Sequence, residues 1–218
     1  MSMTKDARSE IEKTLRRHTG LEACRGEIER AVELVVSAYR AGRKVLTAGN
    51  GGSSADADHI VGELMKRFAR PRPLAQTIRT RIENAPIESE LKRRLEDGLE
   101  QPLKAVNLAA HTALYTAFAN DADPALAYAQ ALLGFADAGD VLIAISTSGG
   151  SENVVAAAAL ARALDVSVIA LTGASGGRLA ELADAAIRAP AHVTAEVQEY
   201  HLPIYHTICA AVEAELFP

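Results

Sequence analysis

Cysteine is scarce in this chain, and the two that occur, Cys24 and Cys209, belong to no CxxC pair. A disulfide scaffold or a cysteine-rich zinc module is therefore not expected. The start of the chain is charged and has no apolar stretch followed by a small-residue cleavage site, so we expect no secretory signal. Together these features predict a protein of the reducing cytoplasm.

Long apolar runs and an excess of basic charge are also lacking. The longest nearly apolar run, residues 154–161, is far shorter than the roughly 20 residues that a membrane helix needs. The formal net charge is −5, with 23 Lys and Arg against 28 Asp and Glu. This balance argues against a generally basic nucleic-acid-binding surface and against a polybasic membrane anchor. We expect neither nucleic acid nor a membrane as a partner.

Aromatic residues make up only 4% of the chain and tryptophan is absent, whereas 49% of the 218 residues are hydrophobic. The chain can bury one sizeable core, packed mainly from Ala, Leu, Val and Ile. Short apolar runs that are typical of buried strands alternate with segments of helical periodicity. We expect five strands, at residues 44–48, 105–109, 141–145, 166–171 and 185–188.

Strands that alternate with helices predict an α/β fold of three layers, in which helices cover both faces of a five-stranded parallel sheet. We expect a single domain over residues 1–218 that begins with a helical segment at residues 1–42. Residues 69–104 differ from the rest in their mixed charge and prolines, and they predict an insertion or lid with a helix over residues 87–99. The prolines are Pro71, Pro73, Pro86 and Pro102.

A glycine-rich turn follows the first predicted strand. Ligands of parallel sheets bind at the carboxyl ends of strands, glycines let the backbone approach a ligand, and a following helix N-terminus attracts anions. The turn is neither a Walker loop nor a GxGxxG fingerprint. A phosphate loop and an ordinary tight turn therefore both remain open for Asn50, Gly51, Gly52 and Ser53.

A second turn, residues 146–151, carries four hydroxyls at the next such junction. Helix N-capping explains one or two of them, but not four. Two uncharged, donor-rich turns in one α/β domain favour a phosphorylated small molecule bound without lysines. The hydroxyls belong to Ser146, Thr147, Ser148 and Ser151.

His59 and Glu63 are four positions apart, which places both side chains on one face of the helix that follows the first turn. They could hold a divalent metal, or Glu63 could serve as a general base. Such a pair is also common on solvated helices without any ligand. The residues alone leave these interpretations open.

The C-terminal segment has no Lys or Arg from residue 191 to residue 218, which favours a cation there. Gln198 and His206 are eight positions apart, about 12 Å along an ideal helix, so a shared ion requires long side chains or a helix start or bend near Pro203. His201 is consistent with a histidine at an interface whose hydrogen bonds are all made. Elsewhere, Asn120 and Asp121 read as turn residues before a helix start.

In combination, these motifs resemble the SIS (sugar isomerase) domain family, and more narrowly its phosphoheptose isomerase branch. The resemblance covers roughly residues 28–217, interrupted by residues 69–104. It implies a flavodoxin-like fold with a five-stranded parallel sheet, and a homotetramer whose sites lie between subunits. The matching segments, in order, are AGNGGSSADADHIVGEL, AND, ISTSGGSENV, LTGASGG and VQEYHLPIYHTICAAVE.

The resemblance also implies roles for individual residues. Glu63 matches the family's proposed base and His206 its acid, for the conversion of sedoheptulose 7-phosphate into an aldoheptose 7-phosphate through an enediol. Asn120 and Asp121 would hold sugar hydroxyls. The zinc-associated positions are His59, Glu63, Gln198 and His206. Contacts to the sugar phosphate would come from Asn50, Gly51, Gly52, Ser53, Glu63, Ser146, Thr147, Ser148, Ser151 and Gln198.

The chain departs from the family pattern at three places. Ala195 stands where relatives can carry an acidic residue, Gly150 replaces a usual asparagine, and the insertion at residues 69–104 is longer than expected. The insertion could read the sugar as a lid or form a contact between subunits. Two other functions remain open: a non-catalytic sugar-phosphate sensor or replication-initiator-binding adaptor, and an isomerase of another ketose phosphate.

Overall fold

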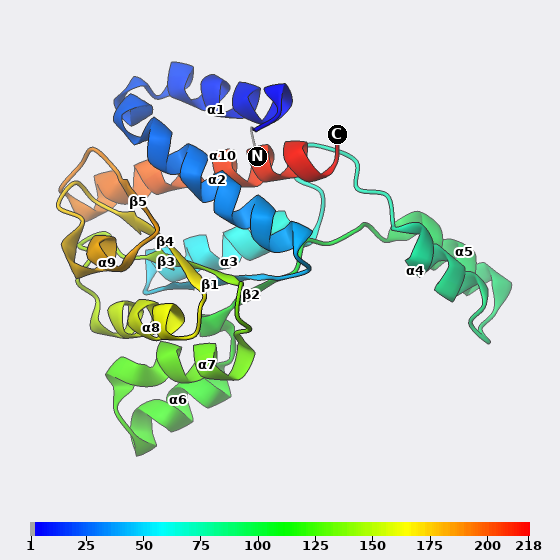
Figure 1. The fold of residues 1–218 in the computed structure, drawn as a ribbon. Coiled ribbons are helices and arrows are strands. Elements are labelled where there is room, and N and C mark those ends of the chain that lie inside the picture. The colour runs from blue at the N-terminus through cyan, green and yellow to red at the C-terminus, as the bar shows by residue number, and fades with distance from the viewer. Residues whose placement is uncertain (1–2) are drawn as a thin grey trace.

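Five parallel strands form the centre of the fold in the computed structural model, which describes residues 3–218 (Figure 1). The order β2-β1-β3-β4-β5 confirms the predicted parallel sheet. Strands β1 and β3, adjacent in the sheet, pair in register from Val45 with Val141 to Gly49 with Ile145. The strands are β1 (Val45–Gly49), β2 (Ala105–Asn107), β3 (Val141–Ile145), β4 (Ser167–Thr172) and β5 (Ala185–Arg188).

Helices cover both faces of this sheet. Successive side chains of a strand point to opposite faces, and here the side chains on both faces are apolar. Val45 and Ile143 point into one core and Leu46 and Leu142 into the other. The first core is covered by α1 (Lys5–Arg17), α2 (Arg25–Arg40), α3 (Gly52–Met65) and α10 (Thr194–Leu216). The second is covered by α7 (Ala127–Phe135), α8 (Glu152–Ala163) and α9 (Gly177–Leu182), with α6 (Thr112–Asp121) packed on α7. Short 3₁₀ turns occur at η1 (Thr19–Cys24), η2 (Leu108–Ala110) and η3 (Pro124–Leu126).

Two helix boundaries differ from the sequence expectations. The N-terminal helical segment is divided into α1 and α2 by η1, near Gly20. Helix α10 runs unbroken through Pro203, so the helix start considered there is wrong. The hydroxyl of Thr207 donates a 2.6 Å hydrogen bond to the Pro203 carbonyl within this continuous helix.

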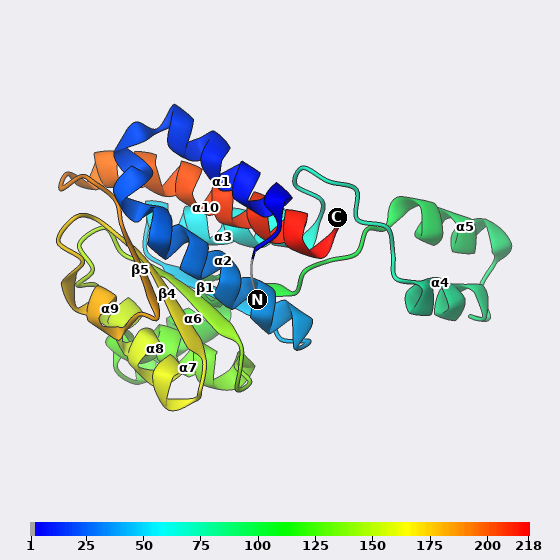
Figure 2. The same cartoon turned by 45° about the horizontal axis from the view of Figure 1, so that its top comes forward.

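The insertion forms a two-helix arm that projects away from the sheet (Figures 1 and 2). The expected helix is α5 (Ser89–Gly98), but α4 (Gln76–Glu83), which no sequence signal predicted, pairs with it. Neither arm helix buries a side chain against any of residues 3–218. The base of the arm is anchored, because Leu103 N donates to Leu64 O at 3.0 Å and Gln101 N to Arg72 O at 2.9 Å.

The carboxyl ends of β1 and β3 define the edge where a ligand is expected. From β1 the chain continues to β2 at one edge of the sheet, and from β3 it continues to β4 in the opposite direction. The strand order therefore reverses between β1 and β3. Open α/β sheets bind ligands at such a switch point. Both donor-rich turns lie there. Within residues 3–218, no helix is long and apolar enough to cross a membrane.

Candidate functional site

The first turn, residues 49–54, is held in a conformation that requires glycine. Gly51 has a φ of +55°, and a Cβ on Gly49 would lie 2.5 Å from the Ser53 carbonyl oxygen. Tyr128 donates a hydrogen bond from its hydroxyl to the Gly49 carbonyl, which fixes the end of β1. The turn therefore presents the N-terminus of α3 to the switch point.

The second turn, residues 146–151, lies against the first. The side-chain amides of Asn50 and Asn153 exchange two hydrogen bonds, of 2.8 and 2.9 Å. The Ser146 and Ser151 hydroxyls are 2.9 Å apart, and Gly150 N donates to the Ser148 hydroxyl at 3.1 Å. The two turns thus form one polar rim at the start of α3 and α8.

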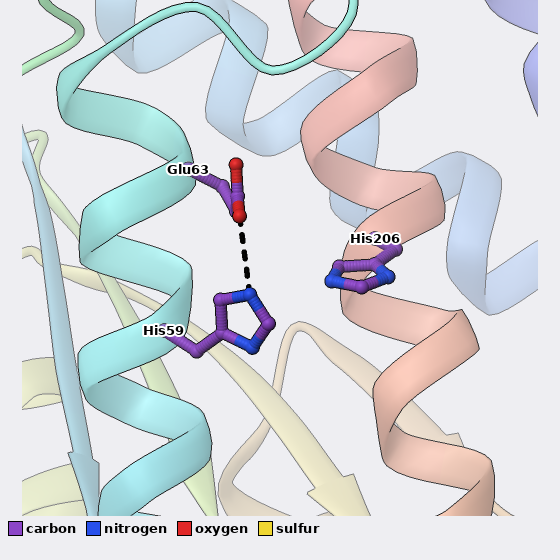
Figure 3. Close-up of side chains that lie close together, drawn as sticks. All are labelled: His59, Glu63 and His206. Carbon is purple, nitrogen blue, oxygen red and sulfur yellow. Dashed lines mark hydrogen bonds and ion pairs between the residues drawn. The ribbon is translucent and has the colours of Figure 1, made fainter.

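Helices α3 and α10 run side by side and bring three of the predicted residues together (Figure 3). His59 Nε2 lies 3.1 Å from Glu63 Oε1. The rings of His59 and His206 have centroids 5.0 Å apart, at 89° to each other. One ligand atom from each of His59, Glu63 and His206 lies within 4.8 Å of the other two. The i,i+4 pair is therefore joined to the C-terminal histidine by tertiary packing.

His206 carries an unused nitrogen. Its Nε2 is buried without a hydrogen-bond partner among residues 3–218. Burial, followed by the neighbouring His59, lowers the pKa of His206, although Glu63 opposes this. A neutral imidazole with a free lone pair is the form that binds a divalent metal. The arrangement of His59, Glu63 and His206 therefore fits a metal ion.

Sequence reasoning missed Asp56 and Tyr205, which complete the cluster. His59 Nδ1 lies 2.9 Å from the Tyr205 hydroxyl, which is 3.3 Å from Asp56 Oδ1. Burial raises the pKa of Asp56, while the hydrogen bond from Tyr205 lowers it. Asp56 precedes His59 by three positions, so helical spacing could have placed it nearby. Nothing in the sequence linked Tyr205 to either.

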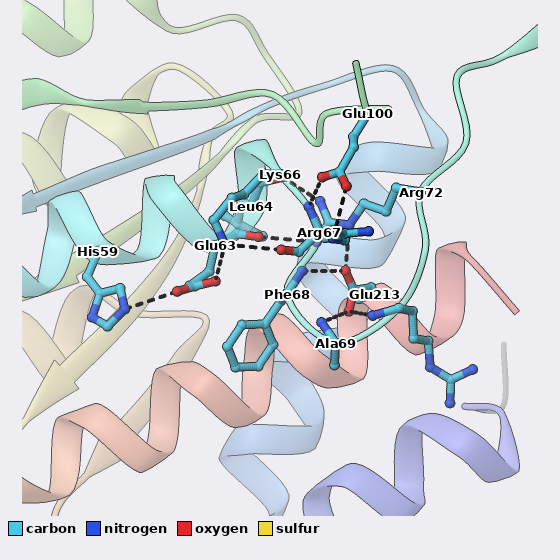
Figure 4. Close-up of polar contacts among 11 residues, drawn as sticks. His59, Glu63, Leu64, Lys66, Arg67, Phe68, Ala69, Arg72, Glu100 and Glu213 are labelled. Carbon is cyan, nitrogen blue, oxygen red and sulfur yellow. Dashed lines mark hydrogen bonds and ion pairs between the residues drawn. The ribbon is translucent and has the colours of Figure 1, made fainter. Parts of the chain in front are cut away.

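A buried ion pair at the end of α3 was also missed (Figure 4). Arg72 and Glu213 are fully shielded from solvent and joined by a 2.6 Å contact between Nε and Oε1. Arg72 donates further hydrogen bonds to the carbonyls of Leu64, at 2.6 Å, and Glu63, at 3.2 Å. It therefore caps the last turn of the helix that carries Glu63.

Glu213 holds the loop that follows. Its carboxylate accepts hydrogen bonds from the backbone N–H groups of Phe68, Ala69 and Arg70 at 2.7–2.9 Å. The Phe68 ring in turn lies 5.3 Å from the ring of His206. The ion pair thus holds both the end of α3, which carries Glu63, and the loop that places Phe68 against His206.

The other predicted residues have different neighbours. The side chain of Gln198 lies against Gly52. Its Nε2 is 2.5 Å from the position that a Cβ on Gly52 would occupy. Asn120 and Asp121 are exposed at the end of α6 and are joined to each other by a 2.8 Å hydrogen bond. His201 is fully buried, with Nε2 3.3 Å from the Thr172 carbonyl and Nδ1 unpartnered within the described chain.

Comparisons with known proteins agree with this architecture. Two SIS domain models match, one over residues 98–214 and the other over residues 9–110. Phosphoheptose isomerases from Shewanella denitrificans and Shewanella frigidimarina are each 36% identical over 200 residues. These matches cover 90% of this chain and 88% and 87% of those proteins.

Solved structures are similar over nearly their full length. A phosphoheptose isomerase from Francisella tularensis has a TM-score of 0.72 at 29% identity, covering 94% of this chain and 95% of that one. The enzyme from Neisseria gonorrhoeae has a TM-score of 0.68 at 30% identity, with coverages of 95% and 91%. The chain therefore belongs to the SIS domain family, in its phosphoheptose isomerase branch.

Proposed function

We propose that this protein interconverts sedoheptulose 7-phosphate and D-glycero-D-manno-heptose 7-phosphate through an enediol. The observation that carries the proposal is the convergence of three side chains: Glu63 and His59, on the helix that leaves a donor-rich turn, meet His206 of α10. A carboxylate and an imidazole at one point are the acid–base groups that an aldose–ketose isomerisation needs.

The two polar turns would bind the phosphate. The N-terminus of α3 and that of α8 both lie at these turns, where the positive end of a helix dipole favours an anion, and the hydroxyls of the second turn add donors. Gln198, which lies against Gly52, would contact the substrate beside the first turn. Asn120 and Asp121 would take sugar hydroxyls. The remaining contacts would come from Asn50, Gly51, Gly52, Ser53, Ser146, Thr147, Ser148 and Ser151.

Glu63 is the base in this proposal. Its carboxylate removes a proton from C1 of the ketose while a protonated His206 donates a proton to the carbonyl oxygen on C2, which gives the enediol. His206 then takes the proton from the oxygen on C1, and Glu63 returns its proton to C2. The sugar has been isomerised and both residues regain their starting state. A histidine suits the second role because it can donate and accept protons near neutral pH.

Zinc is the metal that we propose for the cluster. His59, Glu63 and His206 would hold it, and Gln198 is the fourth member of the proposed set. The unpartnered Nε2 of His206 supports this assignment. When bound, zinc would stabilise negative charge on the substrate oxygens.

We further propose that the protein is a cytoplasmic homotetramer with its sites between subunits. Both cysteines are free and buried, which fits a reducing compartment. Met65 on α3 and Leu202 on α10 are 45% and 42% exposed, on the helices that carry the cluster. The arm of α4 and α5 buries no side chain within the described chain, and helices this short gain most of their stability from packing. A neighbouring subunit would cover these surfaces.

The test is an NMR assay of the zinc-loaded protein with sedoheptulose 7-phosphate, with Glu63→Gln as the control. We expect an aldoheptose phosphate to form with the unaltered protein, and the variant to bind the sugar phosphate without turning it over. Undiminished turnover by the variant would rule out Glu63 as the base. If neither protein turned it over, shorter ketose phosphates and tight binding of a protein partner would be examined as the competing functions.

A further inference from the structure

The hydroxyl of Tyr205 lies between an acidic side chain and a proposed metal ligand. It is 3.3 Å from Asp56 Oδ1 on one side and 2.9 Å from His59 Nδ1 on the other. Only 1% of Tyr205 is exposed, so its hydroxyl is itself shielded from water beside these two partners. The ring is held edge-on to His59, with centroids 5.4 Å apart.

The protons available to these groups determine the direction of both hydrogen bonds. An ionised carboxylate can only accept, so Tyr205 must donate its single hydroxyl proton to Asp56. The hydroxyl oxygen is then left as an acceptor, and His59 must supply the proton of the second hydrogen bond from Nδ1. A neutral His59 with its proton on Nδ1 has an unprotonated Nε2.

That unprotonated nitrogen faces the cluster. Nε2 of His59 lies 3.1 Å from Glu63 Oε1, so a lone pair meets a carboxylate oxygen. In this neutral form two acceptors meet at this distance, and the contact becomes favourable when a proton or a metal ion lies between them. The unpartnered Nε2 of His206 belongs to the same group of ligand atoms. The hydrogen bonds behind His59 thus favour a metal in front of it.

We propose that Tyr205, oriented by Asp56, is a positioning residue that keeps the proton of His59 on Nδ1 and its Nε2 free for a divalent metal. The inference rests on the role of His59 proposed above. Tyr205 and Asp56 would act as hydrogen-bond partners of a metal ligand. Such partners commonly fix the tautomer and the orientation of a ligating histidine. Tyr205 touches neither the substrate nor the metal in this proposal.

The experiment compares Tyr205→Phe with the unaltered protein. Phenylalanine keeps the ring and removes only the hydroxyl. Tyr39→Phe is the matched control, because Tyr39 donates a 3.2 Å hydrogen bond to the Lys104 carbonyl away from the cluster. The ¹⁵N resonances of His59 in the metal-free proteins at pH 8 report which ring nitrogen holds the proton, and calorimetric titration with zinc reports affinity.

We expect a proton on Nδ1 of His59 in the unaltered protein and in Tyr39→Phe, with or without a second proton on Nε2 in the absence of metal. In Tyr205→Phe the proton on Nδ1 should be lost and the remaining proton should lie on Nε2, where Glu63 accepts its hydrogen bond, and zinc affinity should fall by about 10- to 100-fold. Asp56→Asn should shift the tautomer in the same direction, because an amide can donate to the Tyr205 hydroxyl and so allow that hydroxyl to donate to His59.

A His59 protonated on Nε2 alone in the unaltered protein, or unchanged His59 resonances and zinc affinity in Tyr205→Phe, would overturn the inference. Neither readout depends on turnover. Failure of the isomerase assay would therefore not be confused with failure of this proposal.

Discussion

Arg72 and Glu213 form a 2.6 Å ion pair between two side chains that are both fully buried. The pair joins the last turn of α3, through the Leu64 and Glu63 carbonyls, to the loop that carries Phe68. Its position means that the geometry of Glu63 and the packing of Phe68 on His206 depend on the same two charges.

Replacement of Glu213 by glutamine should impair the site as well as stability. The change leaves Arg72 charged and buried without its counter-ion, which typically costs about 3–5 kcal/mol. We expect the free energy of unfolding, measured in urea, to fall by about this amount. The ring resonances of His206 should also shift, because Phe68 would no longer be held beside it. Turnover measured well below the unfolding transition should fall.

Asp140→Asn is the matched control for this change. Asp140 is also fully buried and accepts hydrogen bonds from Lys44 N at 3.0 Å and Asp137 N at 2.8 Å, at the opposite end of the sheet. We expect it to lower stability without moving the His206 resonances. Equal shifts in both variants would show that the effect on His206 is a general consequence of destabilisation.

Two glycine-to-alanine changes should separate binding from folding. A Cβ at Gly149 would lie 1.9 Å from the backbone oxygen of Gly176, and the φ of Gly149 is +65°. We expect Gly149→Ala to lower the free energy of unfolding by about 2–4 kcal/mol. At Gly52 the Cβ would instead meet the mobile end of Gln198. Gly52→Ala should therefore fold normally but raise KM, and an unchanged KM would argue against substrate contact by Gln198.

Acid should destabilise the protein through His201. Burial lowers the pKa of His201 below 6.5, so the unfolded chain binds a proton that the folded protein resists. The stability linked to this group is complete above pH 6.5 and is lost as pH falls below it, by up to about 1.4 kcal/mol per pH unit. Urea unfolding between about pH 7.5 and pH 5 should show a shallower dependence in His201→Gln. Identical slopes would show that other groups dominate.

The arm should be needed for assembly. Leu91 is 45% exposed on α5 and would be covered by a neighbouring subunit in the proposed tetramer. We expect Leu91→Glu to reduce the mass measured by light scattering from that of four 23.0 kDa chains, whereas Leu91→Met keeps the apolar surface and the mass. A tetramer that survives Leu91→Glu would locate the subunit contacts elsewhere.

Much of the fold could be predicted from local pattern. The apolar run at residues 141–145 is β3, residues 185–188 are β5, and Asp123 caps the turn at Pro124, as its spacing indicates. Helix α4 could not be predicted, because its polar sequence QTIRTRIE gives no strong apolar face. The boundary between α1 and α2 could not be placed, because both segments share helical periodicity.

The candidate site was only partly visible in the sequence. Spacing of four placed His59 beside Glu63, since both lie on one helix face. The spacing of eight between Gln198 and His206 left open whether their side chains meet, and in the structure the Gln198 amide lies beside Gly52. Tyr205, Arg72 and Glu213 gave no local signal, because each acts on residues far away along the chain.

The sequence by itself determined the parallel α/β architecture, the two donor-rich turns and the resemblance to the SIS family, because these depend on periodicity and short motifs. Only the tertiary structure decided that His206 meets His59 and Glu63, and that Arg72 and Glu213 are buried together at the end of α3. The physical reason is the packing of α10 alongside α3. It brings together residues more than 140 positions apart, as Glu213 and Arg72 are, and sequence spacing carries no information about such contacts.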